Sequence, residues 1–256
     1  MIWIPPYLYR RLPGISSFLV GDRLRTRWLL SSKNRIHLTF DDGPHPEITE
    51  QVLDILGKYN AKATFFLLGK NVEAYPMLAQ KIVEAGHGLG NHTYSHLDGW
   101  KSNTNKYVED IRHCQLLLPK GKEEPSTFGP DIIHSSGSES DFSGHSGANL
   151  SEVKERKSIP YQPRLFRPPY GHFTYYQYRW LKRADYITVL WTHLSLDFRT
   201  ELSPEKILKG LLKGSFRAGD VIVFHDSEKA SPRMLYALPR FIETMMGKGY
   251  IFESLV

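Results

Sequence analysis

Two adjacent carboxylates, Asp41 and Asp42, follow an apolar run in the segment LTFDDGPHPE of residues 38–47. Successive side chains of a β-strand point to opposite faces, so these two carboxylates could have two different jobs. The simpler interpretation is a turn, because Asp accepts local backbone hydrogen bonds and Gly-Pro ends a strand. The polar residues elsewhere in the chain decide between a turn and a site.

A pair of histidines, His92 and His96, lies four residues apart in the segment GNHTYSH. On one helical turn their rings would face the same way, and two imidazoles with one carboxylate make a three-ligand site for a divalent metal. Chance is the alternative, since the chain has 11 histidines. With Asp42 as the third ligand and the remaining positions open to water, the set is typical of a catalytic metal centre.

Apolar runs of strand length alternate with segments of helical period. We expect strands at 35–40, 63–68, 87–90, 164–166, 186–191, 221–224 and 251–254, and helices at 49–59, 74–84, 105–118, 174–183, 203–213 and 231–248. Thr49 and Ser203 are expected to cap helices, Pro204 and Pro232 to occupy first helical positions, and Gly86 to follow a helix end. Seven strands alternating with helices predict a mostly parallel sheet.

Reactive groups in such sheets gather at the carboxyl ends of the strands. Polar segments follow five of the expected strands at this end: the Asp pair, then GNHTYSH, FRPPYG, WTHLSLDF and VFHDS. This recurrence favours one site assembled from several strands over a set of unrelated turns. His45, His172 and His193 fall near the same end and are expected to line the cleft or contact the substrate.

The composition is that of an ordinary globular protein, with 256 residues of which 41% are hydrophobic and 23% charged, and one large domain is expected. The formal net charge is +6, but the basic residues are scattered and form no nucleic-acid motif, so a nucleic-acid partner is not expected. The single cysteine, Cys114, cannot form an internal disulfide. A monomer is the expected oligomeric state.

Two segments are expected to lie outside the regular alternation. Residues 1–34 should form an arm that packs on the domain 35–256, and its arginines could also make weak contact with an anionic membrane surface. Prolines and charges interrupt this arm, and no 18 apolar residues run together, so neither a signal peptide nor a transmembrane helix is expected and the cytoplasm is the default location. Residues 119–163 include SSGSESDFSGHSG and are expected to form a flexible surface insertion.

The ordered motifs TFDDGP, HTYSH, RPPYG, LDF and FHD resemble those of the polysaccharide deacetylases, the NodB homology group of the carbohydrate esterases, family 4. The resemblance covers residues 35–228 and implies a single α/β domain with a distorted, TIM-like (β/α)7 barrel. It also implies metal-dependent hydrolysis of N-acetyl, sometimes O-acetyl, groups on an acetylated glycan. The metal is usually Zn²⁺, although Co²⁺, Mn²⁺ and Ni²⁺ accept the same nitrogen and oxygen ligands.

The resemblance assigns a role to each matching residue. Asp42, His92 and His96 match the metal ligands, and Asp41 matches the general base. A metal lowers the pKa of its water from 15.7 toward about 7, so a neighbouring carboxylate suffices as the base. The two adjacent aspartates would therefore divide the work, one holding the metal and one taking a proton.

The later motifs supply the remaining roles that the resemblance implies. Arg167 matches the arginine that positions the base, and His225 matches the general acid, whose pKa Asp197 is expected to raise. The backbone N–H of Tyr170 is expected to stabilise the oxyanion. Three further residues are expected to contact the substrate: Pro168, Phe198 and Val223.

Two positions depart from the family pattern. Leu194 and Phe198 stand where many members have an acid and a tryptophan, so Arg167 is expected to depend on Asp41 alone for its orientation. Two alternative functions stay open. One is an Fe(II) oxygenase, which also uses two histidines and one carboxylate. The other is a glycan-binding or regulatory protein with this fold and weakened catalysis.

Overall fold

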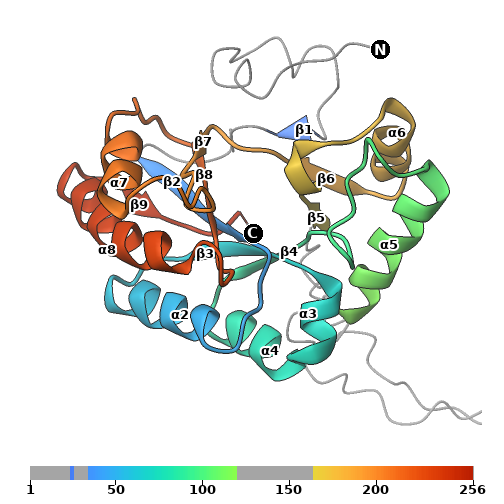
Figure 1. Cartoon of the computed structure of the whole chain (residues 1–256), viewed down its shortest axis with the longest axis horizontal. Helices are drawn as coiled ribbons and strands as arrows, with labels where there is room; N and C mark the ends of the chain where they lie inside the picture. Colours follow the sequence, from blue (N-terminus) through green and yellow to red (C-terminus); the bar gives the residue numbers. More distant parts are fainter. Residues whose placement is uncertain (1–23, 26–33, 120–163, 256) are drawn as a thin grey trace, which may run out of the picture. The chain divides into compact units, whose positions relative to one another are not determined.

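The computed structural model describes residues 24–25, 34–119 and 164–255. These residues form parallel strands with helices packed around them (Figure 1). The expected insertion lies outside the described residues apart from its first residue, and so does the expected arm apart from one short strand and Asn34. Both expectations therefore stay predictions.

The strands make one sheet in which every neighbouring pair is parallel. In spatial order they are β1 (Leu24–Arg25), β6 (Tyr186–Val189), β5 (Arg164–Phe166), β4 (Gly88–Asn91), β3 (Ala63–Leu67), β2 (Arg35–Asp41), β8 (Val221–His225) and β7 (His193–Leu194). A last strand, β9 (Ile251–Phe252), pairs with the start of β2. Among the described residues β1 and β7 do not pair, so the barrel is open there. The predicted distorted (β/α)7 barrel is confirmed.

Helices connect the strands and cover the outside of the sheet (Figure 1). In chain order they are α2 (Ile48–Lys58), α3 (Gly69–Ala74), α4 (Pro76–Glu84), α5 (Thr104–Leu117), α6 (Tyr175–Arg183), α7 (Pro204–Leu212) and α8 (Ser231–Gly247), and a short 3-10 turn, η2 (Pro169–Gly171), follows β5. Between β2 and β3, and again between β5 and β6, one helix returns the chain to the amino end of the next strand, and between β3 and β4 the pair α3 and α4 does so. The carboxyl ends of the strands are thereby left to the loops that carry the polar motifs.

Most predicted elements are confirmed to within one or two residues, but four details differ. The helix predicted at 74–84 is preceded by the separate helix α3, because Tyr75 between them has an extended φ of −132°. The short strands β1 and β7 were not predicted, and the predicted strand 186–191 ends at Val189. Thr49 does not cap α2, whose N-cap is Glu47.

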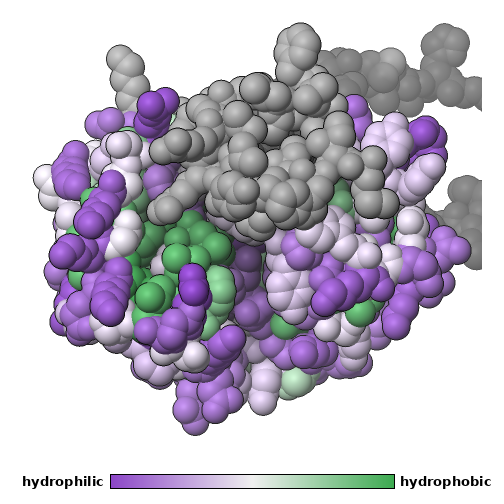
Figure 2. All heavy atoms as spheres, turned by 45° about the horizontal axis from the view of Figure 1, so that its top comes forward, coloured by the Kyte–Doolittle hydropathy of each residue, from purple (hydrophilic) through white to green (hydrophobic). Residues whose placement is uncertain are grey.

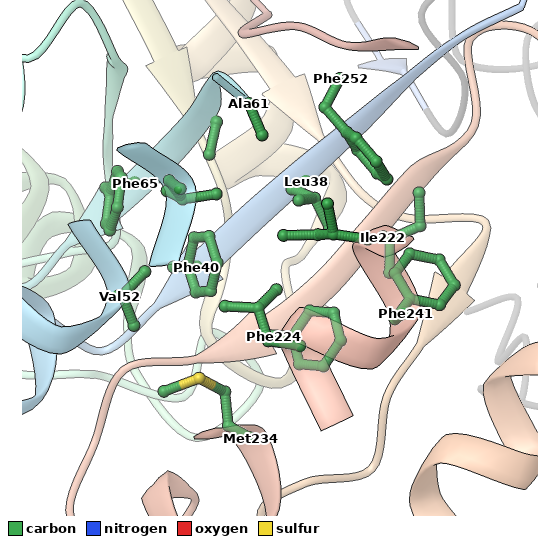
Figure 3. Packing of buried hydrophobic residues seen from close by; sticks show 14 of the residues in the cluster. Leu38, Phe40, Val52, Ala61, Phe65, Ile222, Phe224, Met234, Phe241 and Phe252 are labelled. Atoms are coloured by element: carbon green, nitrogen blue, oxygen red, sulfur yellow. The ribbon is translucent and has the colours of Figure 1, made fainter. Parts of the chain in front are cut away.

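The alternation of β2 decides which side chains enter the barrel. Ile36, Leu38 and Phe40 point outward into the main hydrophobic core against the helices, and Figure 3 shows Leu38 and Phe40 beside core residues from β3, β8 and α8. The residues between them therefore face the barrel interior. Asp41, the last residue of β2, is on that inner face.

The described surface is mixed in character. Figure 2 shows one face on which hydrophilic side chains predominate and hydrophobic side chains gather in one area. No helix among the described residues has the length and apolar character needed to cross a membrane.

Candidate active site

Asp42, His92 and His96 come together at the carboxyl ends of β2 and β4. One potential ligand atom from each lies within 4.8 Å of the others. Asp42 Oδ1 is 3.3 Å from His96 Nε2 and 3.8 Å from His92 Nε2. This oxygen is buried and has no hydrogen-bond partner among the described residues. A buried, unpaired carboxylate oxygen facing two imidazoles fits a bound cation, because it is otherwise costly.

The two histidines reach this position by a loop and not by the helical turn expected from their spacing. His92 and His96 lie in irregular backbone after β4, and φ is positive at Thr93 (67°) and His96 (62°). Asp110 of α5 holds the loop by accepting the backbone N–H groups of Tyr94 (2.8 Å) and Ser95 (3.0 Å). The role of Asp110 leaves no pattern in the sequence, because it depends on the packing of α5.

The protonation of His96 and the orientation of His92 also suit a metal. Burial, with the charge of His92, lowers the pKa of His96 to about 4, so this ring is neutral at pH 7. His92 Nδ1 lies 2.8 Å from the carbonyl oxygen of Arg167, a contact that orients its other nitrogen, Nε2, toward Asp42. Two imidazole nitrogens and one carboxylate oxygen are ligands that Zn²⁺ accepts.

Asp41 has a different environment from its neighbour. Its carboxylate is 4% exposed, and Oδ1 accepts a 2.7 Å hydrogen bond from Arg167 Nη1. Burial by itself would raise the pKa of Asp41, but the charge and hydrogen bond of Arg167, together with the charges of His92 and His225, hold this pKa below its usual value. Asp41 therefore stays ionised at neutral pH, and it is not one of the three residues whose ligand atoms lie together.

Arg167 is more firmly held than the sequence suggests. It is fully buried and its guanidinium carbon lies 4.1 Å from the centre of the Phe66 ring. Its partners besides Asp41 are Thr39 Oγ1 (2.7 Å), Val189 O (3.2 Å) and Leu190 O (3.2 Å). The expectation that Arg167 depends on Asp41 alone is wrong, because the backbone carbonyl groups of the last residue of β6 and of the residue after it take the place of a second carboxylate.

His225 ends β8, where its Cα is the register partner of Asp41. Its ring Nδ1 is 2.7 Å from Asp197 Oδ1, and its backbone N–H donates to Asp197 Oδ2 at 2.9 Å. Burial lowers the pKa of His225, but the charge and hydrogen bond of Asp197 outweigh this effect and raise it to about 9. The Phe198 ring meets the His225 ring edge-on at 5.1 Å.

Comparison with known proteins agrees with this geometry. Residues 31–130 match the family profile described as polysaccharide deacetylase. The chain is 31% identical over 222 residues to a peptidoglycan-N-acetylglucosamine deacetylase of Bacillus cereus, which covers 86% of this chain and 85% of that protein. The chain belongs to the polysaccharide deacetylase family.

Solved structures of this family share the fold. A peptidoglycan N-acetylglucosamine deacetylase in complex with 4-naphthalen-1-yl-N-oxidanyl-benzamide has a TM-score of 0.67 and 30% identity, covering 88% of this chain and 87% of that one. A CE4 family pseudoenzyme from Bacillus anthracis has a TM-score of 0.62 at 20% identity, covering 88% of this chain and 64% of that one. This second likeness concerns the fold alone.

In this member of the polysaccharide deacetylase family, Asp226 is a further buried acid. It is the last residue of the FHD motif, and the sequence assigns it no role. Its Oδ2 accepts a 2.6 Å hydrogen bond from Thr49 Oγ1, and its Oδ1 accepts the backbone N–H of Gly43 at 3.0 Å. Burial raises the pKa of Asp226 to about 8. A Cβ on Gly43 would collide with the Asp226 carboxyl group, so this turn requires glycine. Asp226 thus joins the turn after Asp42 to the end of β8.

The remaining expected residues differ in their access to the site. Tyr170 is exposed and in a left-handed conformation (φ 59°), and its ring lies 4.7 Å from the His96 ring. Phe198 is half-buried, whereas Pro168 is buried and Val223 has no exposed surface. Substrate contact by Pro168 or Val223 therefore has no support in this structure.

Of the three additional histidines expected near the mouth, one is misplaced. His193 Nε2 lies 3.2 Å from Asp220 Oδ2, just before the start of β8, whereas His225 is at the end of that strand. His193 is therefore at the amino end of the sheet, and the expectation is wrong. His45 begins the approach to α2, where its Nδ1 lies 3.4 Å from the backbone nitrogen of Ile48.

Proposed function

We propose that this protein is a metal-dependent hydrolase that removes N-acetyl groups from a glycan, with Asp41 as the general base and His225 as the general acid. The observation that carries the proposal is the buried, unpaired Oδ1 of Asp42, which faces the Nε2 atoms of His92 and His96 beside the ionised Asp41. An acid, an anionic base and a metal-ligand set at one barrel end are the groups that amide hydrolysis needs.

Asp42, His92 and His96 would hold the metal. When bound, a divalent cation at such a site acidifies a water molecule and polarises a carbonyl oxygen. The donor set suits Zn²⁺, and Co²⁺, Mn²⁺ and Ni²⁺ share its ligand preferences.

Asp41 takes the proton of the water whose oxygen attacks the acetyl carbonyl carbon. Its pKa is held low by Arg167, so it is ionised and ready to accept that proton at neutral pH. A carboxylate with a low pKa is a weak base, and it suffices only for an acidified water. Arg167, fixed by two carbonyl groups and Thr39, keeps the carboxylate in one orientation.

His225 gives a proton to the nitrogen when the carbon–nitrogen bond breaks, so that acetate and a free amine leave. Asp197 keeps the ring protonated, since it raises the pKa of His225 to about 9. We assign stabilisation of the negative oxygen of the attacked carbonyl to the backbone N–H of Tyr170, a residue whose ring lies 4.7 Å from the ring of His96. Phe198 forms an apolar wall beside the acid.

The glycan we propose to test first contains N-acetylglucosamine. Two relatives that are 31% and 30% identical over most of this chain are named peptidoglycan-N-acetylglucosamine deacetylases. Cleavage of an amide also gives the protonated His225 a task, because an amine leaves poorly without a proton. We therefore propose preference for N-acetyl over O-acetyl groups.

A glycan-binding protein with weak catalysis is the alternative that one observation favours. Leu194 stands where many family members have an acid, and a pseudoenzyme with this fold exists. Against it, Arg167 has other partners in place of the missing acid. The two proposals differ in one measurable outcome, which is turnover by metal-loaded protein.

The test combines metal content with acetate release from acetylated glycans, using protein that has been chelated and then resupplied with metal. Asp41→Asn should keep the metal and lose turnover, whereas His92→Ala should lose both. Asp54→Asn on the exposed face of α2 makes the same chemical change away from the site and should keep both. Full turnover in Asp41→Asn would eliminate Asp41 as the base, and metal binding without turnover in the unaltered protein would favour the glycan-binding alternative.

A further inference from the structure

A row of aromatic rings leads away from the metal-ligand set along the surface. The His96 ring meets the Tyr170 ring edge-on, with centroids 4.7 Å apart, and the Tyr170 ring lies 5.7 Å from that of His172. His172 then stacks on Trp100, with centroids 3.6 Å apart and planes 9° from parallel. Aromatic contacts therefore link the proposed catalytic centre to Trp100, two rings beyond Tyr170.

The far end of this row is accessible and apolar. Tyr170 is 58% exposed and Trp100 is 44% exposed. His172 covers one face of the indole, so the exposed area of Trp100 is its other face and edge. The indole Nε1 already donates to the carbonyl oxygen of Phe173 at 3.2 Å, so its one polar group is satisfied. What remains is a flat apolar surface with no unmet hydrogen bond.

The indole is also fixed in place before anything binds. Asp98 Oδ1 accepts the backbone N–H of Trp100 at 3.0 Å and lies 3.0 Å from His172 Nδ1, so one carboxylate holds both stacked residues. Gly99 lies between Asp98 and Trp100 in sequence, and a Cβ there would collide with the His172 carbonyl oxygen, so the two loops are in close contact. A ligand that stacks on a fixed ring loses little side-chain entropy on binding.

The chemistry of this surface matches a sugar ring. A pyranose presents C–H groups on its faces and hydroxyl groups around its edge, so it fits a flat aromatic surface that has polar acceptors at its rim. Asp98 supplies such an acceptor, because the contact of its Oδ2 within the described residues is with Lys101 Nζ, 4.0 Å away. If Trp100 served only to join the two loops, the face that stacks on His172 would be enough. The exposed face of Trp100 has no such structural role.

We propose that Trp100 and His172, continued by Tyr170, form a subsite that stacks a pyranose ring of the same glycan, beyond the sugar whose acetyl group is cleaved. This inference rests on the proposed function for the identity of the ligand. It predicts that longer oligosaccharides bind more tightly than short ones, because only longer chains reach Trp100 from the catalytic centre.

The experiment measures binding, without turnover, of the hexamer and dimer of β-1,4-linked N-acetylglucosamine to the full chain after metal removal, by calorimetry. The hexamer should bind more tightly than the dimer. Trp100→Ala should weaken hexamer binding about 3- to 10-fold, the range expected for losing one aromatic stacking contact. Trp100→Phe should restore most of the affinity, since it keeps an aromatic face.

A matched control is Leu116→Ala, which shortens another exposed apolar side chain, on α5, and should leave hexamer binding as in the unaltered protein. Nuclear magnetic resonance gives a second measurement that does not depend on a variant's folding: hexamer should shift the Trp100 indole Nε1 resonance and leave that of Trp180 in place.

Three results would overturn the subsite: no hexamer binding, no advantage of hexamer over dimer, or equal hexamer affinity in Trp100→Ala. Failure of the proposed function is read separately, from acetate release by metal-loaded protein. Hexamer that binds and shifts Trp100 but releases no acetate counts against deacetylation and supports the subsite.

Discussion

Replacing Asp197 by Asn should lower the pKa of His225 and remove the proton that the proposed mechanism requires. Asp197 is fully buried and contacts His225 twice, through the ring Nδ1 at 2.7 Å and the backbone N–H at 2.9 Å. An amide keeps a similar shape but carries no charge. Burial then acts on the imidazole without its counter-charge and disfavours the protonated form.

The magnitude follows from the pKa of His225, which is about 9 in the structure against an ordinary value of 6.5. We expect Asp197→Asn to bring it to 6.5 or lower. At pH 7.5 the protonated fraction of His225 would then be about one-tenth in Asp197→Asn, against more than nine-tenths in the unaltered protein. A difference of this size corresponds to about 3 kcal/mol between the two protonation states.

The same shift has a stability consequence with a definite sign. A histidine whose pKa is raised on folding stabilises the folded state fully below pH 6.5, and this contribution is lost as pH rises through about 9. The unaltered protein should therefore lose about 3 kcal/mol of unfolding free energy across this window. Asp197→Asn should lack that pH dependence.

Two assays check the prediction. Histidine resonances of metal-depleted protein, followed from pH 5 to 10 by nuclear magnetic resonance, should show the His225 midpoint falling from about 9 to 6.5 or lower in Asp197→Asn. As pH rises, acetate release by metal-loaded Asp197→Asn should decline at a correspondingly lower pH than acetate release by the unaltered protein. The control Asp54→Asn should titrate as the unaltered protein does. An unchanged His225 midpoint would refute the assignment of Asp197 as its charge partner.

Other substitutions test the surroundings of the site. Gly90→Ala should lower the free energy of unfolding by about 1–3 kcal/mol in denaturant titrations, because its Cβ would collide with the Phe66 ring that lies under Arg167. Arg167→Met should cost about 3–5 kcal/mol at pH 7 by leaving Asp41 buried without a partner, and the loss should shrink as pH falls and Asp41 becomes protonated. Asp226→Asn should keep most acetate release at pH 7, because an amide resembles the protonated acid. Asp226→Leu should lose acetate release, because it removes the hydrogen bond from the backbone N–H of Gly43 in the turn after β2.

The strand ends could be predicted well from the sequence for two reasons. Hydrophobic alternation is a strong signal for strands, and reactive groups in parallel sheets regularly gather at the carboxyl ends of the strands. Asp42, His92 and His96 were assigned from motif order, and the structure brings them within 4.8 Å even though the predicted helical turn between the histidines is a loop. Motif spacing therefore identified the site better than it identified the local backbone. The reason is that the strand ends, and not the loop itself, bring the residues together.

What the sequence could not predict depends on contacts between distant segments. The partners of Arg167 include the carbonyl groups of Val189 and Leu190, and a carbonyl group leaves no mark in the side-chain sequence. Val223 lies two residues before His225 on the inner face of β8, but its complete burial depends on how the barrel closes around it. The two-residue strand β7 is too short to show a period.

The division of labour between the two aspartates follows from where β2 stops. Asp41 is the last strand residue and points into the barrel toward Arg167, while Asp42 leaves the strand with a φ of 81° and turns its carboxylate to the histidines. Asp tolerates this left-handed conformation better than most residues, but it still needs support. Asp226 gives that support on both sides, since its backbone N–H donates to the Asp41 carbonyl oxygen at 3.1 Å and its carboxyl group accepts from Gly43. A residue with no assigned chemistry therefore holds the chain reversal that separates the proposed base from the proposed metal ligand.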